Sequence, residues 1–131
     1  MATNLQSHIE KLIKRVDGLE AVLITDRDGV IILKAAVDNL STKLLEPILS
    51  NTFVVASDQA SKLGLKKNHS IVNIFGLHQI VQFNFSPLVL SLVADSEANT
   101  GVLMDLGSEL KSFTDIIIAA ISEQKPKDDE Q

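Results

Sequence analysis

A stripe of apolar residues near the start of the chain predicts an amphipathic α-helix. Its members fall at positions i, i+4, i+7, i+8 and i+11, a spacing that places side chains on one helical face. They are Leu5, Ile9, Leu12, Ile13 and Val16. Gly18 follows this stripe, and glycine commonly stands just past the end of a helix. We therefore expect the first helix to end close to Val16.

A β-hairpin is predicted next. Residues 19–25 and 30–36 are rich in β-formers, and Asp26-Arg27-Asp28-Gly29 joins them. The Asp-Gly step supplies the positive φ that a tight turn needs.

Three short strands are predicted in the second half of the chain. They cover residues 70–75, 77–85 and 88–94, where valine, isoleucine and phenylalanine are frequent. Gly76 separates the first two, and Ser86-Pro87 interrupts the chain before the third.

Two further segments have helical patterns. Residues 41–64 form the first, with Ser41 or Thr42 as its cap, and Pro47 inside it predicts a separate or kinked first turn. Residues 99–121 form the second, because large apolar residues recur there at three- and four-residue steps.

The predicted order of elements is therefore α-β-β-α-β-β-β-α. Short connections between strands make the paired strands antiparallel. We expect one α+β domain over residues 1–122, with helices on the faces of the sheet. Residues 123–131 have no apolar side chain to bury and predict a disordered acidic tail.

Composition narrows the classes of function. The chain has 131 residues, no Cys, a net charge of −5 and a pI of about 5.1. The missing thiols exclude a disulfide scaffold, a Cys nucleophile and Cys-containing zinc and iron–sulfur sites. The acidic balance argues against nucleic acid as a partner, although a local basic patch is compatible with it. No apolar run approaches the roughly 20 residues of a membrane span, so we expect no direct membrane binding.

Two short motifs have some features of binding loops. Asp26-Arg27-Asp28-Gly29 resembles the start of a calcium loop, but Val30, Ile31 and Val37 occupy the positions where an EF-hand needs a ligand, a glycine and a glutamate. We interpret it as a hairpin turn. Residues 62–67, Lys-Leu-Gly-Leu-Lys-Lys, lack the glycine and Gly-Lys-Ser/Thr pattern of a phosphate loop. They are interpreted as a solvated helix end, with a small cationic docking patch as the alternative.

No local motif indicates catalysis or metal binding. The three histidines, His8, His69 and His78, form no pair with metal-ligand spacing, and no Gly-x-Ser-x-Gly elbow is present. We therefore predict no catalytic residues, no metal and no cofactor. A scattered Ser/His/Asp site is the alternative that sequence leaves open.

The second helix predicts a contact with another chain. On a wheel of about 100° per residue, its apolar residues cover about half of the circumference, wider than the roughly 100° that one sheet requires. With the sheet-facing centre set near Leu45, small or apolar residues on and beside this arc are assigned to a partner. They are Leu49, Phe53, Ala56, Ser57 and Ala60. The alternative is a helix buried broadly within its own chain.

The strand that follows supports this assignment. Residues 71–75, Ile-Val-Asn-Ile-Phe, are apolar on both faces and carry no charge. At the edge of a sheet such a strand would be prone to aggregation, whereas a partner strand would satisfy its backbone groups. Ile71, Asn73 and Phe75 are assigned to this pairing strand.

Several segments resemble the roadblock superfamily and, within it, the MEK-partner scaffold subunits of Ragulator complexes. The resemblance covers about residues 4–121, and Ala60 stands where the family leads us to expect glycine. The matching segments are Thr25-Asp26-Arg27-Asp28-Gly29-Val30, Ser57-Asp58-Gln59-Ala60-Ser61-Lys62-Leu63-Gly64-Leu65, Lys67-Asn68-His69-Ser70-Ile71, Gln79-Ile80-Val81-Gln82-Phe83-Asn84, Pro87-Leu88-Val89 and Ser96-Glu97-Ala98-Asn99-Thr100-Gly101.

The resemblance implies a roadblock/profilin-like fold. Such a fold has a five-stranded antiparallel sheet, one long helix on one face and the two terminal helices on the other. Family members dimerise through the long helix and the adjoining third strand, which gives a sheet that continues across both subunits.

The resemblance also implies a function and its partners. It implies a non-catalytic adaptor that pairs with a second roadblock-type subunit, scaffolds MEK and ERK kinases, and docks Rag GTPases for TOR signalling. A lipidated subunit would hold this pair on the cytoplasmic face of late endosomes and lysosomes, and the chain would otherwise be cytosolic. The alternatives are a roadblock subunit of another assembly, such as a dynein light chain or a small-GTPase regulator, and an uncharacterised cytosolic enzyme.

Overall fold

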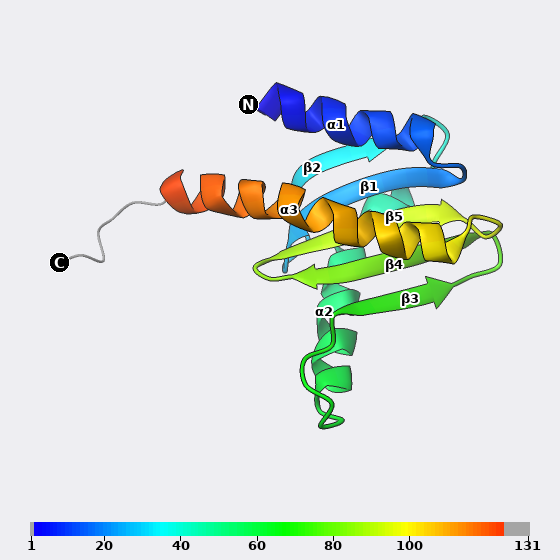
Figure 1. Cartoon of the computed structure of the whole chain (residues 1–131). Helices are drawn as coiled ribbons and strands as arrows, with labels where there is room; N and C mark the ends of the chain where they lie inside the picture. The colour runs from blue at the N-terminus through cyan, green and yellow to red at the C-terminus, as the bar shows by residue number, and fades with distance from the viewer. Residues whose placement is uncertain (1, 125–131) are drawn as a thin grey trace.

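The computed structural model describes residues 2–124 and shows three α-helices, five strands and one short 3₁₀ helix in that part of the chain (Figure 1). Their order matches the order predicted from sequence. In chain order they are α1 (Ala2–Arg15), β1 (Leu19–Asp26), β2 (Ile31–Ala36), η1 (Thr42–Leu45), α2 (Ile48–Ser61), β3 (Ser70–Ile74), β4 (His78–Phe85), β5 (Leu88–Asp95) and α3 (Thr100–Gln124).

The five strands form one antiparallel sheet in the order β2-β1-β5-β4-β3. The first and last strands along the chain, β1 and β5, are therefore neighbours at its centre. Both central strands are buried on both faces apart from their ends. The predicted antiparallel α+β sheet is confirmed.

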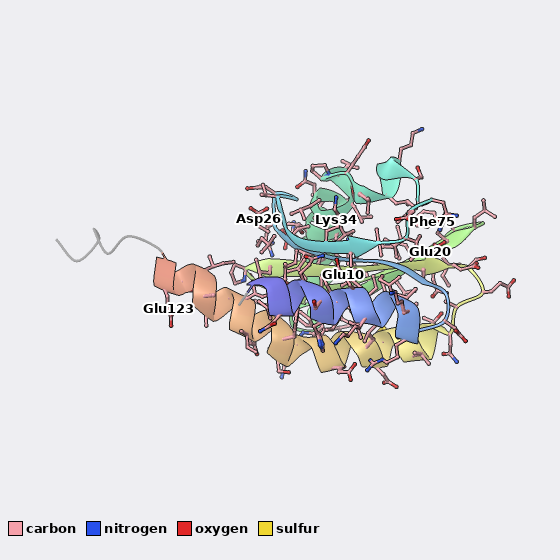
Figure 2. All side chains as sticks on the ribbon, turned by 90° about the horizontal axis from the view of Figure 1, so that it is seen from above. Glu10, Glu20, Asp26, Lys34, Phe75 and Glu123 are labelled. Carbon is pink, nitrogen blue, oxygen red and sulfur yellow. The ribbon has the colours of Figure 1, made fainter. Side chains whose placement is uncertain are left out.

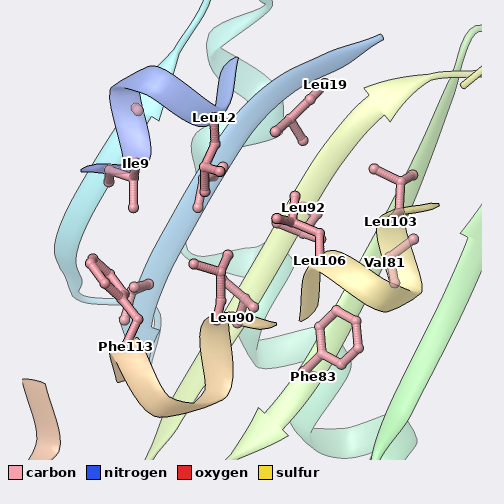
Figure 3. Close-up of a cluster of buried hydrophobic side chains, with 14 of the residues drawn as sticks. Ile9, Leu12, Leu19, Val81, Phe83, Leu90, Leu92, Leu103, Leu106 and Phe113 are labelled. Atoms are coloured by element: carbon pink, nitrogen blue, oxygen red, sulfur yellow. The ribbon is translucent and has the colours of Figure 1, made fainter. Parts of the chain in front are cut away.

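The helices lie in two layers, as the roadblock resemblance implies. Figure 2 shows α1 and α3 on one side of the sheet and α2 on the other. The larger apolar core lies beneath α1 and α3 and includes Ile9, Leu12, Leu103 and Phe113 (Figure 3). A smaller cluster beneath α2 contains Ala21, Leu23, Ile80 and Val93.

The helices differ from the predicted ranges in two places. Pro47 divides the segment expected at residues 41–64 into η1, which Ser41 caps, and α2, which has 14 residues. The helix on this face is therefore shorter than α3, which has 25 residues and extends to Gln124. The predicted tail from residue 125 onward lies outside the described residues.

The turn between β1 and β2 confirms the hairpin interpretation. Asp26 Oδ1 accepts hydrogen bonds from the backbone N–H groups of Asp28 and Val30, both at 2.9 Å. Gly29 has φ +91°, and a Cβ there would collide with Pro47 at the start of α2. The carboxylate of Asp26 is thus used to close the turn.

Gln79 fixes the connection between β5 and α3. It is buried, and its Nε2 donates to the carbonyl oxygens of Ala98 at 2.8 Å and Asp95 at 3.2 Å. The Thr100 hydroxyl donates to Gln79 Oε1 at 2.7 Å. One amide therefore holds the loop that starts the longest helix.

Replacing Gln79 by leucine is expected to lower the free energy of unfolding by about 1–3 kcal/mol, because the Ala98 carbonyl and Thr100 hydroxyl would lose a buried partner. Urea denaturation measures this loss. The same change at exposed Gln59 should stay within about 0.5 kcal/mol of the parent. Equal effects at both positions would contradict this role for Gln79.

Candidate partner interface

The two edges of the sheet differ in how they are protected. At the β2 edge, Gln6 Nε2 of α1 donates to the backbone carbonyl of Lys34 at 2.7 Å, so a side chain already uses this edge. Lys34 is itself exposed there, and an edge lysine disfavours strand addition. At the other edge, β3 pairs only with β4 among the described strands.

The β3 edge, which we define as Ser70–Ile74 with the adjacent Phe75, is uncharged and apolar. Ile74 is 72% exposed and Phe75 54% exposed. Residues 70–77 contain no Asp, Glu, Lys or Arg. An uncharged open edge of this kind favours pairing with a strand of another chain, because few charges would have to leave water.

The register of β3 places its side chains on defined faces. Ile71 lies opposite Gln82 and Asn73 lies opposite Ile80. Ile80 belongs to the cluster beneath α2, and directly opposite residues in an antiparallel pair share a face. Ile71 and Asn73 therefore lie on the side of the sheet that α2 covers.

The buried face of α2 differs from the predicted one. Phe53 is only 2% exposed, and Ser50 and Ser57 are buried with it. Phe53 and Ser57, which the sequence assigns to a partner, are thus already buried within this single chain, and Ser57 Oγ donates to Asn68 Oδ1 at 3.1 Å. Their contact with a partner stays a prediction. Leu45, at the centre of the predicted sheet-facing side, and Leu49 do pack against the sheet, and the buried face of α2 extends from there to Ser50, Phe53 and Ser57.

The reason lies in polar residues of the sheet. The Thr25 and Ser50 hydroxyls are 2.7 Å apart, and Gln82 Nε2 donates to the Leu49 carbonyl at 3.1 Å and to Ser91 Oγ at 3.0 Å. Small serines bring α2 close enough to make these bonds. Local sequence did not reveal them, because Thr25 and Gln82 are distant in the chain.

The remaining predicted residues of α2 lie together on one flank. At about 100° per residue, Leu49, Ala56 and Ala60 fall on one side of the buried face. Ala56 is exposed, and Leu49 and Ala60 are half-buried. We call these three residues the partner-facing flank. With the β3 edge they remain the predicted interface.

The outer surface of α2 adds exposed apolar residues that the sequence prediction omitted. Val55 is 62% exposed, and Leu63, just past the helix, is 73% exposed. Ile48 is also exposed. Figure 1 shows the C-terminal end of α2 extending past the β3 edge of the sheet. Exposed apolar side chains of α2 and the uncharged β3 edge thus border the same side of the molecule.

The three histidines lie in different parts of the structure. His8 stacks on Phe113 with ring centroids 4.9 Å apart, and His78 Nδ1 lies 2.8 Å from Glu20 Oε1. His69 is exposed before β3. Within residues 2–124, no three His, Cys, Asp or Glu side chains gather closely enough to hold a metal ion. Over the same residues, no helix has the length and apolar character needed to cross a bilayer.

Comparison with protein families gives one match over most of the chain. The family described as "Mitogen-activated protein kinase kinase 1 interacting" matches residues 3–121. The Ragulator complex protein LAMTOR3 of Danio rerio is 49% identical over 110 residues, which cover 84% of this chain and 89% of that protein. The Ragulator complex protein LAMTOR3-A of Xenopus laevis is 45% identical over 123 residues, covering 93% of this chain and 100% of its own length.

Comparison with solved structures shows the same fold. A roadblock/LC7 domain from Streptomyces avermitilis has a TM-score of 0.75 at 16% identity, covering 87% of this chain and 97% of that one. Profilin IA of Acanthamoeba castellanii has a TM-score of 0.60 at 13% identity, covering 83% and 94%.

Proposed function

This chain belongs to the mitogen-activated protein kinase kinase 1 interacting family, and we propose that it is a non-catalytic scaffold subunit of a Ragulator-like complex. The family membership carries this proposal, since the match extends over nearly the whole domain. The roadblock fold supports it, and the sequence resemblance to Ragulator scaffold subunits is confirmed by the same relatives.

The proposed direct partner is a second roadblock-type subunit. It would add its own strand to the β3 edge and lay its own helix beside the partner-facing flank of α2. The exposed Phe75 and Ala56, and the lack of charge on the β3 edge and on the partner-facing flank, support this arrangement. Strand addition supplies backbone hydrogen bonds, and helix contact buries the apolar flank.

The finer partners follow from the Ragulator assignment. A lipidated subunit would wrap around the pair and hold it on late endosomes and lysosomes, so that membrane location is supplied by a partner. The pair would scaffold MEK and ERK and dock Rag GTPases for TOR signalling. Residues 1–122 would act as the roadblock domain, with residues 123–131 as an acidic tail.

Affinity purification from cells tests this function. A tagged full-length chain should recover a second roadblock-type subunit, the lipidated subunit and MEK, identified by mass spectrometry, whereas the tag alone should not. Recovery of dynein chains without Ragulator subunits would instead assign the protein to another roadblock assembly. Substrate turnover by the purified chain would contradict the non-catalytic role.

A further inference from the structure

We propose that a basic cleft on the other flank of α2 binds an acidic peptide segment of a protein partner. The cleft has a volume of about 940 Å³, which is within the range of binding pockets. It lies between α2, the β1–β2 turn, the β4–β5 turn and α3. Its charged residues are Arg27, Lys62, Lys67, Lys111, Asp58 and Asp115.

The cleft lies mainly on the flank of α2 opposite the partner-facing flank, and it meets the exposed outer surface of α2 at Val55. Its α2 residues include Asp58, Ser61 and Lys62, which lie on the flank opposite Ala56 and Ala60. The inference therefore does not rest on the proposed function. The cleft brings the lysine-rich segment at residues 62–67 together with Arg27 and Lys111, which are distant along the chain.

The cleft carries an excess of positive charge, although the chain as a whole is acidic. The chain has a net charge of −5, yet four Lys or Arg residues line the cleft against two Asp residues. Asp58 pairs with Arg27 at 3.5 Å and Asp115 pairs with Lys111 at 3.5 Å. Among the described carboxylates, none forms an ion pair with Lys62 or Lys67.

The loop that carries Lys67 is held in place. The Asn68 backbone N–H donates to Ser61 Oγ at 2.9 Å, and Ser57 Oγ donates to Asn68 Oδ1 at 3.1 Å. The loop also turns through Gly64 at φ +81° and Lys66 at φ +74°. Because these hydrogen bonds fix the loop backbone to α2, Lys67 stays beside the cleft, and binding does not pay the entropic cost of ordering the loop.

Apolar surface in the cleft favours a peptide. Val55 and Phe85 contribute to the lining, and Lys111 Nζ lies 5.7 Å from the centroid of the Phe85 ring. An occupant with carboxylates on either side of one apolar side chain would match both features. A flat anionic membrane matches a recessed, partly apolar cleft less well, and the acidic chain as a whole would be repelled by it.

Fluorescence anisotropy with the labelled peptide DELDEE and the full-length chain tests this site. At about 50 mM salt, where charge interactions are weakly screened, the parent should bind DELDEE and not the neutral analogue NQLNQQ. Lys62→Glu combined with Lys67→Glu should weaken binding at least about tenfold, since two attractive contacts become repulsive. The same charge change at Lys11 and Lys43, which are exposed outside the cleft, should alter it less than about twofold.

A second double variant tests whether the glutamates weaken binding only by destabilising the end of α2. Lys62→Gln combined with Lys67→Gln removes both cations without placing carboxylates at a helix C-terminus, and should still weaken binding several-fold. Amide NMR shifts on adding DELDEE should centre on residues 62–69 and 84–86.

Three results would overturn the proposal. One is absence of DELDEE binding by the parent chain, and another is equal weakening by the Lys11/Lys43 control. The third is displacement of the peptide by inorganic phosphate or by phosphatidylserine vesicles at lower concentration than by unlabelled DELDEE, which would assign the cleft to another anion.

Discussion

Substitution of Ala56 by arginine is expected to weaken binding to the second roadblock-type subunit by at least about a hundredfold, or about 2.8 kcal/mol. Ala56 lies on the partner-facing flank of α2, among residues without charge. Arginine there would place a long cation in a contact that excludes water, where an unpaired buried charge is strongly unfavourable.

The fold of the single chain should survive this change. Ala56 is exposed, so the arginine side chain can extend into solvent before the partner binds. Arginine is also a good helix former. Circular dichroism and the thermal midpoint of the purified chain should therefore remain close to those of the parent.

Isothermal titration calorimetry with the purified partner subunit measures the effect. Ser112→Arg is the matched control, because Ser112 is an exposed small residue of α3 on the opposite face of the sheet. It should bind the partner like the parent. If Ala56→Arg binds the partner normally and Ser112→Arg loses binding, the interface must instead lie on the face that carries α1 and α3.

The helices and strands could be predicted from the sequence because the residue patterns that specify them are local. The stripe from Leu5 to Val16 predicts α1, and the Asp26 to Gly29 turn predicts the hairpin that joins β1 to β2. Strand order depends on contacts across the chain, such as that of β1 with β5, and no local pattern indicates it. The roadblock resemblance implied the five-stranded antiparallel sheet and the helix layers, and the pairing of β1 with β5 comes from the structure.

The interface illustrates the limit of a helical wheel. A wheel reports which residues share a face of α2, but assigning the most apolar face to the sheet assumes that the sheet beneath is apolar. Here Thr25 and Gln82 make it partly polar, so Ser50 packs against it, whereas Ser57 bonds to Asn68 in the loop before β3. The elements of the predicted interface are unchanged, and Phe53 and Ser57 are buried within the single chain.

The second large effect is expected at Gly107, in the middle of α3. Gly107 is buried where α3 passes over β4, and a Cβ at this position would overlap the ring of Phe83. Phe83 is itself buried and stacks on Phe85 with ring centroids 5.7 Å apart. The absence of a side chain at Gly107 therefore allows the long helix to lie close to the ring of Phe83 on the sheet.

Gly107→Ala is expected to reduce the free energy of unfolding by about 2–3 kcal/mol, because overpacking must displace an enclosed ring or lift the helix. This loss should occur although alanine favours a helix over glycine by about 1 kcal/mol. Gly101 is exposed in the first turn of the same helix, where helix propensity contributes less than in the interior, and a Cβ there meets Asn99 Oδ1 at 3.2 Å instead of a ring. Gly101→Ala should therefore change stability by less than about 0.5 kcal/mol.

Urea denaturation of the two single variants and of Gly107→Ala combined with Phe83→Leu separates overlap from any other effect of the alanine. Phe83→Leu shortens the group that the new Cβ meets, so the double variant should be more stable than the sum of the two single losses predicts. Additive losses would show that Phe83 does not oppose a side chain at Gly107. In that case the close packing of α3 on β4 would not depend on the glycine.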